Sequence, residues 1–193
     1  MSPRRPAPLA AEAARRARFE ALFRQVYQPL QSYAARRVAA EAVDDVVADT
    51  LLVLWRRLED VPAEMALPWA YGVARRCVAN ARRGVVRRGQ LVERLSAQPV
   101  TLEPDAADDP SGLQAALASM SDDDRELIRL WAWEQLQPRE IAVVLGISAN
   151  AVSIRLHRAK RELAERATGK DRAAGKDRAA GGHTGVGHTK EAP

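Results

Sequence analysis

Four side chains that can hydrogen-bond to nucleic acid recur on one face of a helix expected in the last third of the sequence. They are Asn150, Ser153, Arg155 and Arg158. Arginine neutralises phosphates and can donate two parallel hydrogen bonds to the edge of guanine. Residues 155–166 contain five Lys or Arg against two Glu, which suits noncovalent recognition of a polyanion. The alternative is a helical hairpin whose basic face is merely solvated.

The residues around these side chains have the spacing of a helix-turn-helix. Pro138 suits the first turn of a helix, because its missing N–H is not needed there. Ala142 is small where a second helix must approach, and Gly146 suits the positive φ of a tight turn. Ser148 can cap the second helix. The buried face of that helix is expected to comprise Val152, Leu156, Ala159 and Leu163. This spacing predicts a DNA-binding helix-turn-helix.

A second basic cluster lies between positions 75 and 88. It contains six Arg and no acidic residue, and it follows Trp69 and Tyr71. Arginines neutralise phosphates while aromatic rings stack on unpaired bases, so this cluster favours binding of a single strand. The alternative is that both aromatic residues belong to the core. Cys77 is expected to be a small buried residue.

The segment from Asp44 to Arg57 is acidic at its start and basic at its end, which stabilises a helix through its dipole. Its apolar residues follow the helical period of about 3.6 residues. The positions on this stripe are Val43, Val46, Val47, Thr50, Leu51, Leu54 and Leu58. The segment is either simply a well-charged helix or one that docks onto the helices of another protein.

The composition excludes several classes of function. The 193 residues are 47% hydrophobic with a net charge of +5, enough for two small domains. The single cysteine rules out an intrachain disulfide, and the three histidines lack further ligands at metal-binding spacing. Because no nucleophile–base pair or phosphate-binding glycine loop occurs, we expect no catalytic residue, cofactor or metal. No apolar run is long enough to span a membrane, and a cytoplasmic protein is expected.

The predicted fold is all-α, with two small helical domains, an acidic linker and a disordered C-terminal tail. Helical periodicity begins near Ala14, and Pro29 is expected to kink or break the first helix. The expected limits are 15–90 for the first domain, 91–112 for the linker, 113–167 for the second domain and 168–193 for the tail. Ser121 and Asp124 predict a capping box. The tail contains the unit GKDRAA twice, a low-complexity pattern.

The segments DDVVADTLLVLWRRL and PWAYGVARRCVANARR precede the helix-turn-helix. In this order and separation, over about residues 18 to 166, the chain resembles bacterial RNA polymerase sigma factors of the extracytoplasmic-function type. The resemblance implies a first domain, region 2, that grips the β′ clamp helices of core RNA polymerase and captures the non-template strand of the −10 element. It implies a second domain, region 4, that reads the −35 duplex and contacts the β flap. An anti-sigma factor is a further expected partner.

The resemblance also assigns roles to individual residues. The polymerase-binding helix would use Asp44, Asp45, Asp49, Leu54, Trp55 and Arg56. Recognition and melting of the −10 element would fall to Arg75, Arg76, Asn80, Arg82 and Arg83. The −35 recognition helix would use Ser148, Asn150, Ser153, Arg155 and Arg158.

The chain departs from the family pattern beside the −10 residues. It has Arg76 where an asparagine is usual, Asn80 where an aspartate is usual, and Gly72 where a larger side chain is common. These departures bear on the −10 sequence preference. The alternative function is a helix-turn-helix transcriptional regulator that acts without polymerase docking, which would leave the arginine cluster without a role. A protein-binding adaptor would not need the helix-turn-helix.

Overall fold

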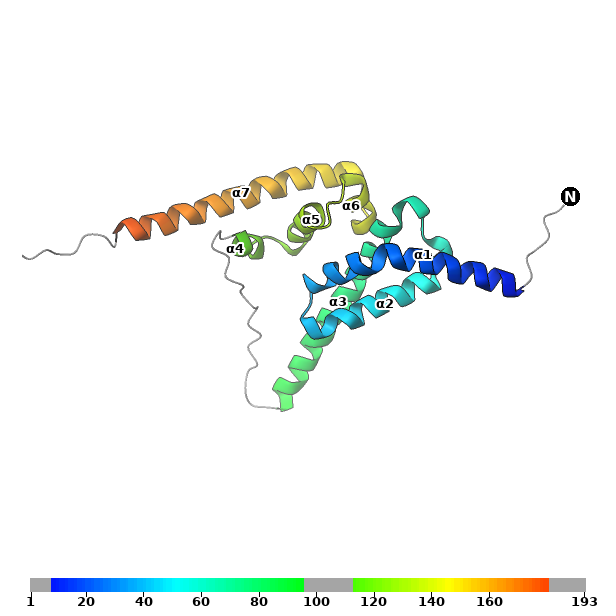
Figure 1. The fold of residues 1–193 in the computed structure, drawn as a ribbon. Coiled ribbons are helices and arrows are strands. Elements are labelled where there is room, and N and C mark those ends of the chain that lie inside the picture. Colours follow the sequence, from blue (N-terminus) through cyan, green and yellow to red (C-terminus); the bar gives the residue numbers. More distant parts are fainter. Residues whose placement is uncertain (1–7, 96–112, 181–193) are drawn as a thin grey trace, which may run out of the picture. The chain divides into compact units, whose positions relative to one another are not determined.

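The computed structural model describes residues 8–95 and 113–180, with side chains described for residues 9–87 and 113–167. Within these ranges the chain forms seven α-helices, three short 3-10 helices and no strand (Figure 1). The α-helices are α1 (Pro8–Ala35), α2 (Val43–Arg56), α3 (Ala66–Leu95), α4 (Leu113–Ala118), α5 (Asp122–Ala132), α6 (Pro138–Leu145) and α7 (Ala149–Ala180). The predicted all-α class is therefore confirmed.

Contacts between residues divide the chain into two compact units. One comprises Met1–Glu103 and Arg129–Ser153, and the other comprises Pro104–Ile128 and Ile154–Pro193. The first unit thus combines α1, α2 and α3 with the end of α5, all of α6 and the start of α7. The predicted domain limits, which follow the order of the chain, stay predictions.

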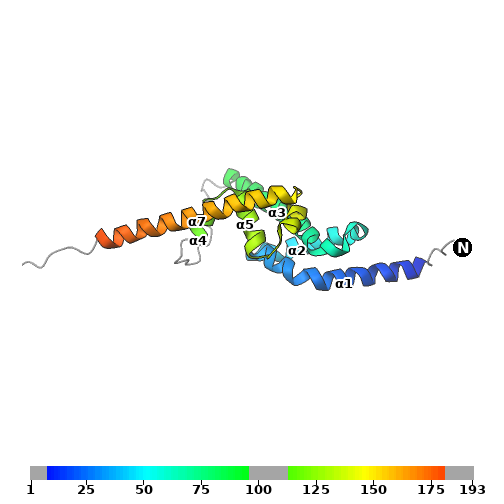
Figure 2. The ribbon, with the colours of Figure 1, turned by 90° about the horizontal axis from the view of Figure 1, so that it is seen from above.

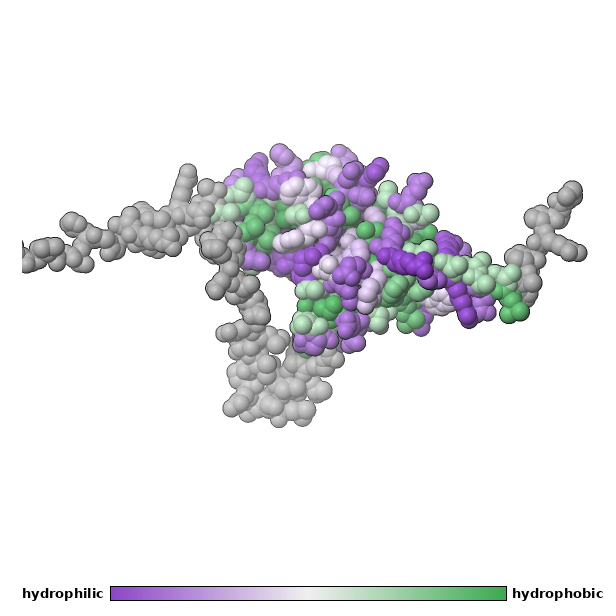
Figure 3. Space-filling view, viewed as in Figure 1, coloured by the Kyte–Doolittle hydropathy of each residue, from purple (hydrophilic) through white to green (hydrophobic). Residues whose placement is uncertain are grey.

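Helices α1, α2 and α3 share one hydrophobic core. Val26 and Leu30 on α1, Leu54 on α2 and Ala70 on α3 are almost completely buried. On each helix the buried residues recur every three or four positions, the period that places them on one face. The buried hydroxyl of Thr50 donates to the carbonyl of Val46 at 2.7 Å, so this polar group is satisfied. On the face seen in Figure 3, hydrophilic residues surround smaller hydrophobic patches.

A kink or a break was expected at Pro29; helix α1 continues through this proline to Ala35, so the helix does not break there. Figure 2 shows α1 as one long helix. A proline inside a helix leaves the carbonyl four residues earlier without its usual partner. That carbonyl belongs to Gln25, which is an exposed residue. Because water can reach this residue, the helix can tolerate the missing bond.

Two helices extend beyond the limits expected from the sequence. Helix α3 continues to Leu95, into the segment predicted as linker, and α7 continues to Ala180, into the tail predicted to be disordered. Elongating an existing helix needs no new nucleation, and Ala, Lys and Arg are good helix formers. The rest of the predicted linker, residues 96–112, and the rest of the tail, residues 181–193, lie outside the described residues.

None of the described helices is, by itself, long and apolar enough to cross a membrane. Only α6 and α7 taken together meet such a criterion, by length and composition, and the two are bent by 103° at their junction.

Candidate nucleic-acid interface

The turn between α6 and α7 has the backbone geometry of a helix-turn-helix. Gly146 adopts the left-handed conformation, with φ 69° and ψ 33°. The backbone N–H groups of Gly146 and Ile147 both donate to the carbonyl of Ala142, at 2.9 and 3.2 Å. These bonds satisfy the end of α6 as in a glycine-terminated helix. The angle of 103° falls within the range for helix-turn-helix motifs.

Both helices of the motif begin at residues that cap them. Pro138 occupies the first turn of α6, and the backbone N–H of Gln137 donates to the carboxylate of Glu140 at 2.7 Å. At the start of α7, the backbone N–H of Ala151 donates to the hydroxyl of Ser148 at 3.2 Å. The N-terminal cap predicted for Ser148 is thus present. Local side-chain chemistry therefore fixes where α7 begins.

The apolar face of α7 is buried largely as predicted. Val152, Leu156 and Ala159 are buried, whereas Leu163 is half-buried. On α6, Ile141 and Val144 are buried. This burial sets the rotation of α7 about its axis, and with it the side chains that face solvent.

The residues predicted to read the −35 element differ in their surroundings. Asn150, Ser153 and Arg158 are exposed. Arg155 is half-buried, and its Nη2 lies 3.7 Å from a carboxylate oxygen of Asp124 and 3.8 Å from one of Asp123. Both carboxylates belong to the first turn of α5. Arg155 therefore has carboxylate neighbours within the chain, which the sequence pattern did not reveal.

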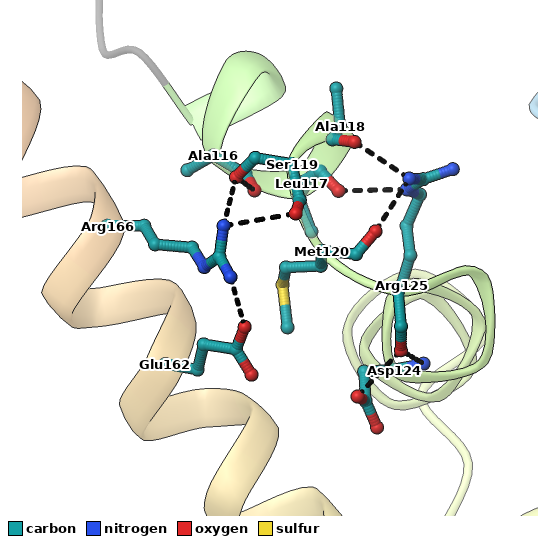
Figure 4. Close-up of polar contacts among 10 residues, drawn as sticks. Ala116, Leu117, Ala118, Ser119, Met120, Asp124, Arg125, Glu162 and Arg166 are labelled. Atoms are coloured by element: carbon teal, nitrogen blue, oxygen red, sulfur yellow. Dashed lines mark hydrogen bonds and ion pairs between the residues drawn. The ribbon is translucent and has the colours of Figure 1, made fainter.

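Arg125 organises the turn that connects α4 to α5 (Figure 4). Its guanidinium donates to the carbonyls of Leu117 and Ala118 at 2.8 Å each and to that of Met120 at 2.9 Å. The last carbonyls of a helix have no partner within the helix, so this arginine satisfies them. Nearby, the backbone N–H of Asp124 donates to the hydroxyl of Ser121 at 3.2 Å, and that hydroxyl donates to the Asp124 carboxylate at 2.7 Å. The cap predicted at Ser121 is thus present.

Arg166 connects α7 to Ser119, the residue that follows α4. Its Nη1 donates to the backbone carbonyl of Ser119 at 3.0 Å and lies 2.8 Å from the hydroxyl of the same residue, while Nη2 pairs with Glu162 at 2.6 Å (Figure 4). This arginine belongs to the basic run that the sequence associates with phosphate. Its contacts within the chain give it a role in positioning α7.

In the arginine cluster of α3, most side chains are exposed, and one exposed arginine, Arg82, also bonds to another part of the fold. Arg76, Asn80 and Arg83 are exposed, and Arg75 is half-buried. Arg83 donates a hydrogen bond to Oδ1 of Asn80. Arg82 instead donates two hydrogen bonds to the backbone carbonyl of Arg37, at 3.1 and 2.8 Å. Arg82 therefore stabilises the fold, a role that the sequence pattern did not indicate.

The aromatic residues before this cluster belong mainly to the packed interior. Tyr71 is 3% exposed and Trp69 is half-buried, which favours the core interpretation over a stacking platform. Cys77 is buried, as expected. Burial raises the pKa of the Cys77 thiol, while a hydrogen bond with Thr50 opposes this increase. The thiol is thus held in its neutral form, as in an unreactive core residue.

Helix α2 presents a charged and partly apolar outer face. Asp44, Asp45 and Asp49 are exposed, as is Arg56 at the other end of the helix. Trp55 is half-buried, with the guanidinium of Arg15 4.5 Å from its ring centroid and Phe19 packed edge-on at 5.1 Å.

Leu54 and Leu52 of the same helix have opposite environments. Leu54 is completely buried, so its side chain contributes to the core and is not available to a partner in this structure. Leu52, which the sequence reasoning did not select, is 45% exposed. Among the described residues, no group of three or more His, Cys, Asp or Glu could hold a metal ion.

Comparisons with known proteins agree with this arrangement of helices. Residues 112–163 match the family described as Sigma-70, region 4. The chain is 33% identical over 160 residues to the ECF RNA polymerase sigma factor SigL of Mycobacterium tuberculosis, covering 79% of this chain and 90% of SigL. It is 32% identical over 156 residues to the RNA polymerase sigma factor CarQ of Myxococcus xanthus, covering 76% of this chain and 87% of CarQ.

Two solved structures share the fold. One is the sigma factor RpoE of Bartonella quintana in complex with the anti-sigma factor NepR, with a TM-score of 0.57 and 22% identity. It covers 77% of this chain and 95% of RpoE. The other is CnrH in complex with the cytosolic domain of CnrY, with a TM-score of 0.52 and 26% identity, covering 81% of this chain and 92% of CnrH.

Proposed function

Since the chain belongs to the extracytoplasmic-function family of RNA polymerase sigma factors, which direct promoter-specific transcription, we propose how its residues divide this task. Two segments read DNA, one on α3 and one on α7, while α2 binds the polymerase. This proposal rests on two features found in one chain: the helix-turn-helix geometry at Gly146 and the separate arginine-rich helix α3. A regulator acting alone would need the helix-turn-helix but not the arginine-rich helix.

The start of α7 reads the −35 element in the major groove. Asn150, Ser153 and Arg158 are exposed there and can reach base edges or phosphates. Arg155 contributes by exchanging its contacts with Asp123 and Asp124 for DNA. These contacts are long and partly exposed, at 3.7 and 3.8 Å, so their loss has a small energetic cost. Ser148 caps the helix and places its first turn at the groove.

Exposed and half-buried side chains of α3 bind the −10 element. Arg75, Arg76 and Arg83 neutralise phosphates, and Asn80 hydrogen-bonds to the edge of an unpaired base. The bond from Arg83 to Oδ1 of Asn80 orients the amide, whose NH2 group can donate to a base edge while Oδ1 keeps a second lone pair. Arg82 acts indirectly, by holding α3 against the end of α1.

The outer face of α2 binds the β′ clamp helices of core polymerase. Exposed Asp44, Asp45 and Asp49 offer charge, Leu52 offers apolar area, and Trp55 and Arg56 complete the surface. Region 4 contacts the β flap. The NepR complex of RpoE supports an anti-sigma protein as a further partner. We infer that the chain acts in the cytoplasm, where polymerase and chromosome are located, and that it catalyses no reaction itself.

A binding experiment tests this division of labour. The first step is to find a transcription start site whose use increases when the chain is overproduced. A labelled DNA duplex from the region upstream of this site is then titrated with the chain, with core polymerase, and with both. We expect specific binding only with both. Arg158→Ala should weaken binding by about 1–3 kcal/mol if the arginine contacts guanine. Arg24→Ala, which removes an exposed arginine of α1 paired with Glu20, is the control. Tight specific binding by the chain alone would instead support a regulator.

A further inference from the structure

An exposed aliphatic side chain lies among the residues of α7 that are proposed to read DNA. Ile154 is 47% exposed, whereas Val152 and Leu156 are buried on the opposite face of the same helix. Ile154 therefore faces solvent and does not belong to the core. A β-branched residue is also a poorer helix former than Ala, Arg or Lys, because the helix restricts its side-chain rotamers. Neither core packing nor helix propensity thus explains an isoleucine at this position.

The neighbours of Ile154 on the surface of α7 are side chains that can hydrogen-bond to DNA. In an α-helix, residues three or four positions apart lie side by side. Asn150 precedes Ile154 by four positions. His157 and Arg158 follow it by three and four positions. All three neighbours are exposed, so Ile154 is an apolar spot within the polar and basic surface that is proposed to face the −35 element.

Ser153, which is exposed next to Ile154, has its hydroxyl turned toward its own helix. This hydroxyl donates to the backbone carbonyl of Ala149 at 3.0 Å. A hydroxyl has a single proton to donate, so in this conformation Ser153 can only accept a hydrogen bond from DNA. An acceptor cannot pair with O4 of thymine or with O6 and N7 of guanine. Of these two residues, only Ile154 can make a contact that is specific to thymine in this structure.

Thymine is the one base of the four in DNA that presents a methyl group in the major groove. Cytosine, the other pyrimidine, presents an amino donor there instead of the O4 acceptor and lacks the methyl group. The side chain of Ile154 cannot hydrogen-bond, so it cannot replace the water that a polar base edge would lose. Apolar side chains contact thymine methyl groups in protein–DNA complexes. The chemistry of Ile154 therefore selects thymine among the four bases.

We propose that Ile154 is a specificity-determining residue, which reads the methyl group of one thymine in the −35 element. The inference rests on the proposed function, because it needs the start of α7 in the major groove of that element. Asn150 and Arg158 are eight positions apart, a rise of about 12 Å along the helix, which corresponds to about three to four base-pair steps. The thymine should accordingly lie between the base pairs that these two residues contact.

The test replaces each thymine of the −35 element, on either strand, with deoxyuridine. Deoxyuridine keeps the base pair and all its hydrogen-bonding groups and lacks only the methyl group. The affinity of the holoenzyme, core polymerase with the full chain, is measured for each duplex. The readout is the ratio of the affinities for the thymine duplex and the deoxyuridine duplex. Incomplete folding of a variant leaves this ratio unchanged, because both duplexes titrate the same preparation.

The parent should bind one of the deoxyuridine duplexes about fourfold more weakly, the change expected for one buried methyl group. Ile154→Ala should bind this duplex and its thymine counterpart equally. Ile154→Val keeps a branched aliphatic side chain and should retain part of the difference. The matched control is Val143→Ala on α6, which also truncates an exposed aliphatic residue, 38% exposed, and should keep the ratio of the parent.

The outcomes separate the inference from the proposed function. A loss of affinity that is confined to one thymine and disappears in Ile154→Ala would support the inference. Equal binding of all deoxyuridine duplexes by the parent, or the same ratio in Ile154→Ala as in the parent, would overturn it and leave the reading of the −35 element by α7 standing. A further duplex has the whole −35 element replaced. If the parent binds that duplex as tightly as the original, the proposed function is contradicted and the inference falls with it.

Discussion

Arg82 on α3 donates two hydrogen bonds to the backbone carbonyl of Arg37, one from Nε at 3.1 Å and one from Nη2 at 2.8 Å. An arginine expected to contact DNA thus joins α3 to the turn that follows α1. Because Arg37 in turn pairs with Glu134, Arg82 also supports the site that receives this carboxylate.

Arg82→Ala should therefore destabilise the fold. Loss of charge-assisted hydrogen bonds to a partly exposed carbonyl should lower the free energy of unfolding by about 1–2 kcal/mol. Denaturant unfolding measures this change. Arg76→Ala, at an exposed position on the same helix, should leave the stability within about 0.5 kcal/mol of the parent. Equal free energies of unfolding for the two variants would show that Arg82 does not stabilise the fold, and would leave DNA binding as its role.

Truncation of Leu52 and of Leu54 on α2 should affect different properties: polymerase binding for Leu52 and stability for Leu54. Leu54→Ala should destabilise the protein by about 2–5 kcal/mol, because Leu54 is completely buried. Leu52→Ala should leave stability nearly unchanged and weaken binding to core polymerase, because Leu52 is 45% exposed. Thermal unfolding and a pull-down with core polymerase separate the two effects. Full polymerase binding by Leu52→Ala would remove this residue from the docking surface.

Gly146 and Gly72 form a second matched pair. Gly146→Ala places a side chain at φ 69° with no atom within 4 Å of the new Cβ, so only backbone strain opposes it. We expect a loss of about 1–2 kcal/mol. Gly72→Ala fits a helix interior with ordinary contacts and should stabilise the protein by about 0.5–1 kcal/mol. Unfolding midpoints that move in the same direction would contradict the conformational account of the turn.

Asn80→Ala should impair melting of the −10 element while polymerase binding stays normal. The amide of Asn80 can both donate and accept, so it can hydrogen-bond to the edge of an unpaired base. Permanganate footprinting on promoters that differ at single −10 positions measures melting and base preference. Ala79→Leu, at the neighbouring exposed position, controls for changes to the surface of α3. The same melting and base preference in Asn80→Ala and the parent would leave only a phosphate-binding surface here.

The helix-turn-helix could be predicted because its signals are local. Pro138, Gly146 and Ser148 each satisfy a backbone requirement within a few residues, and the structure has each of these requirements met. The roles of Arg82 and Glu134 depend on partners 45 and 97 residues away, which no local pattern reveals. Periodicity places Leu54 on the apolar stripe of α2, and the structure buries it. Its expected role in polymerase binding comes only from the resemblance.

This chain should give core RNA polymerase the ability to start transcription at defined sites. The direct measurement is multiple-round transcription with purified core polymerase, the full chain and a supercoiled template carrying the responsive upstream region, followed by mapping of transcript 5′ ends. We expect one discrete start site that requires the chain, needs no ATP hydrolysis by an activator, and is lost when the −10 or −35 element is replaced. Transcripts that start at the same positions with and without the chain would contradict it.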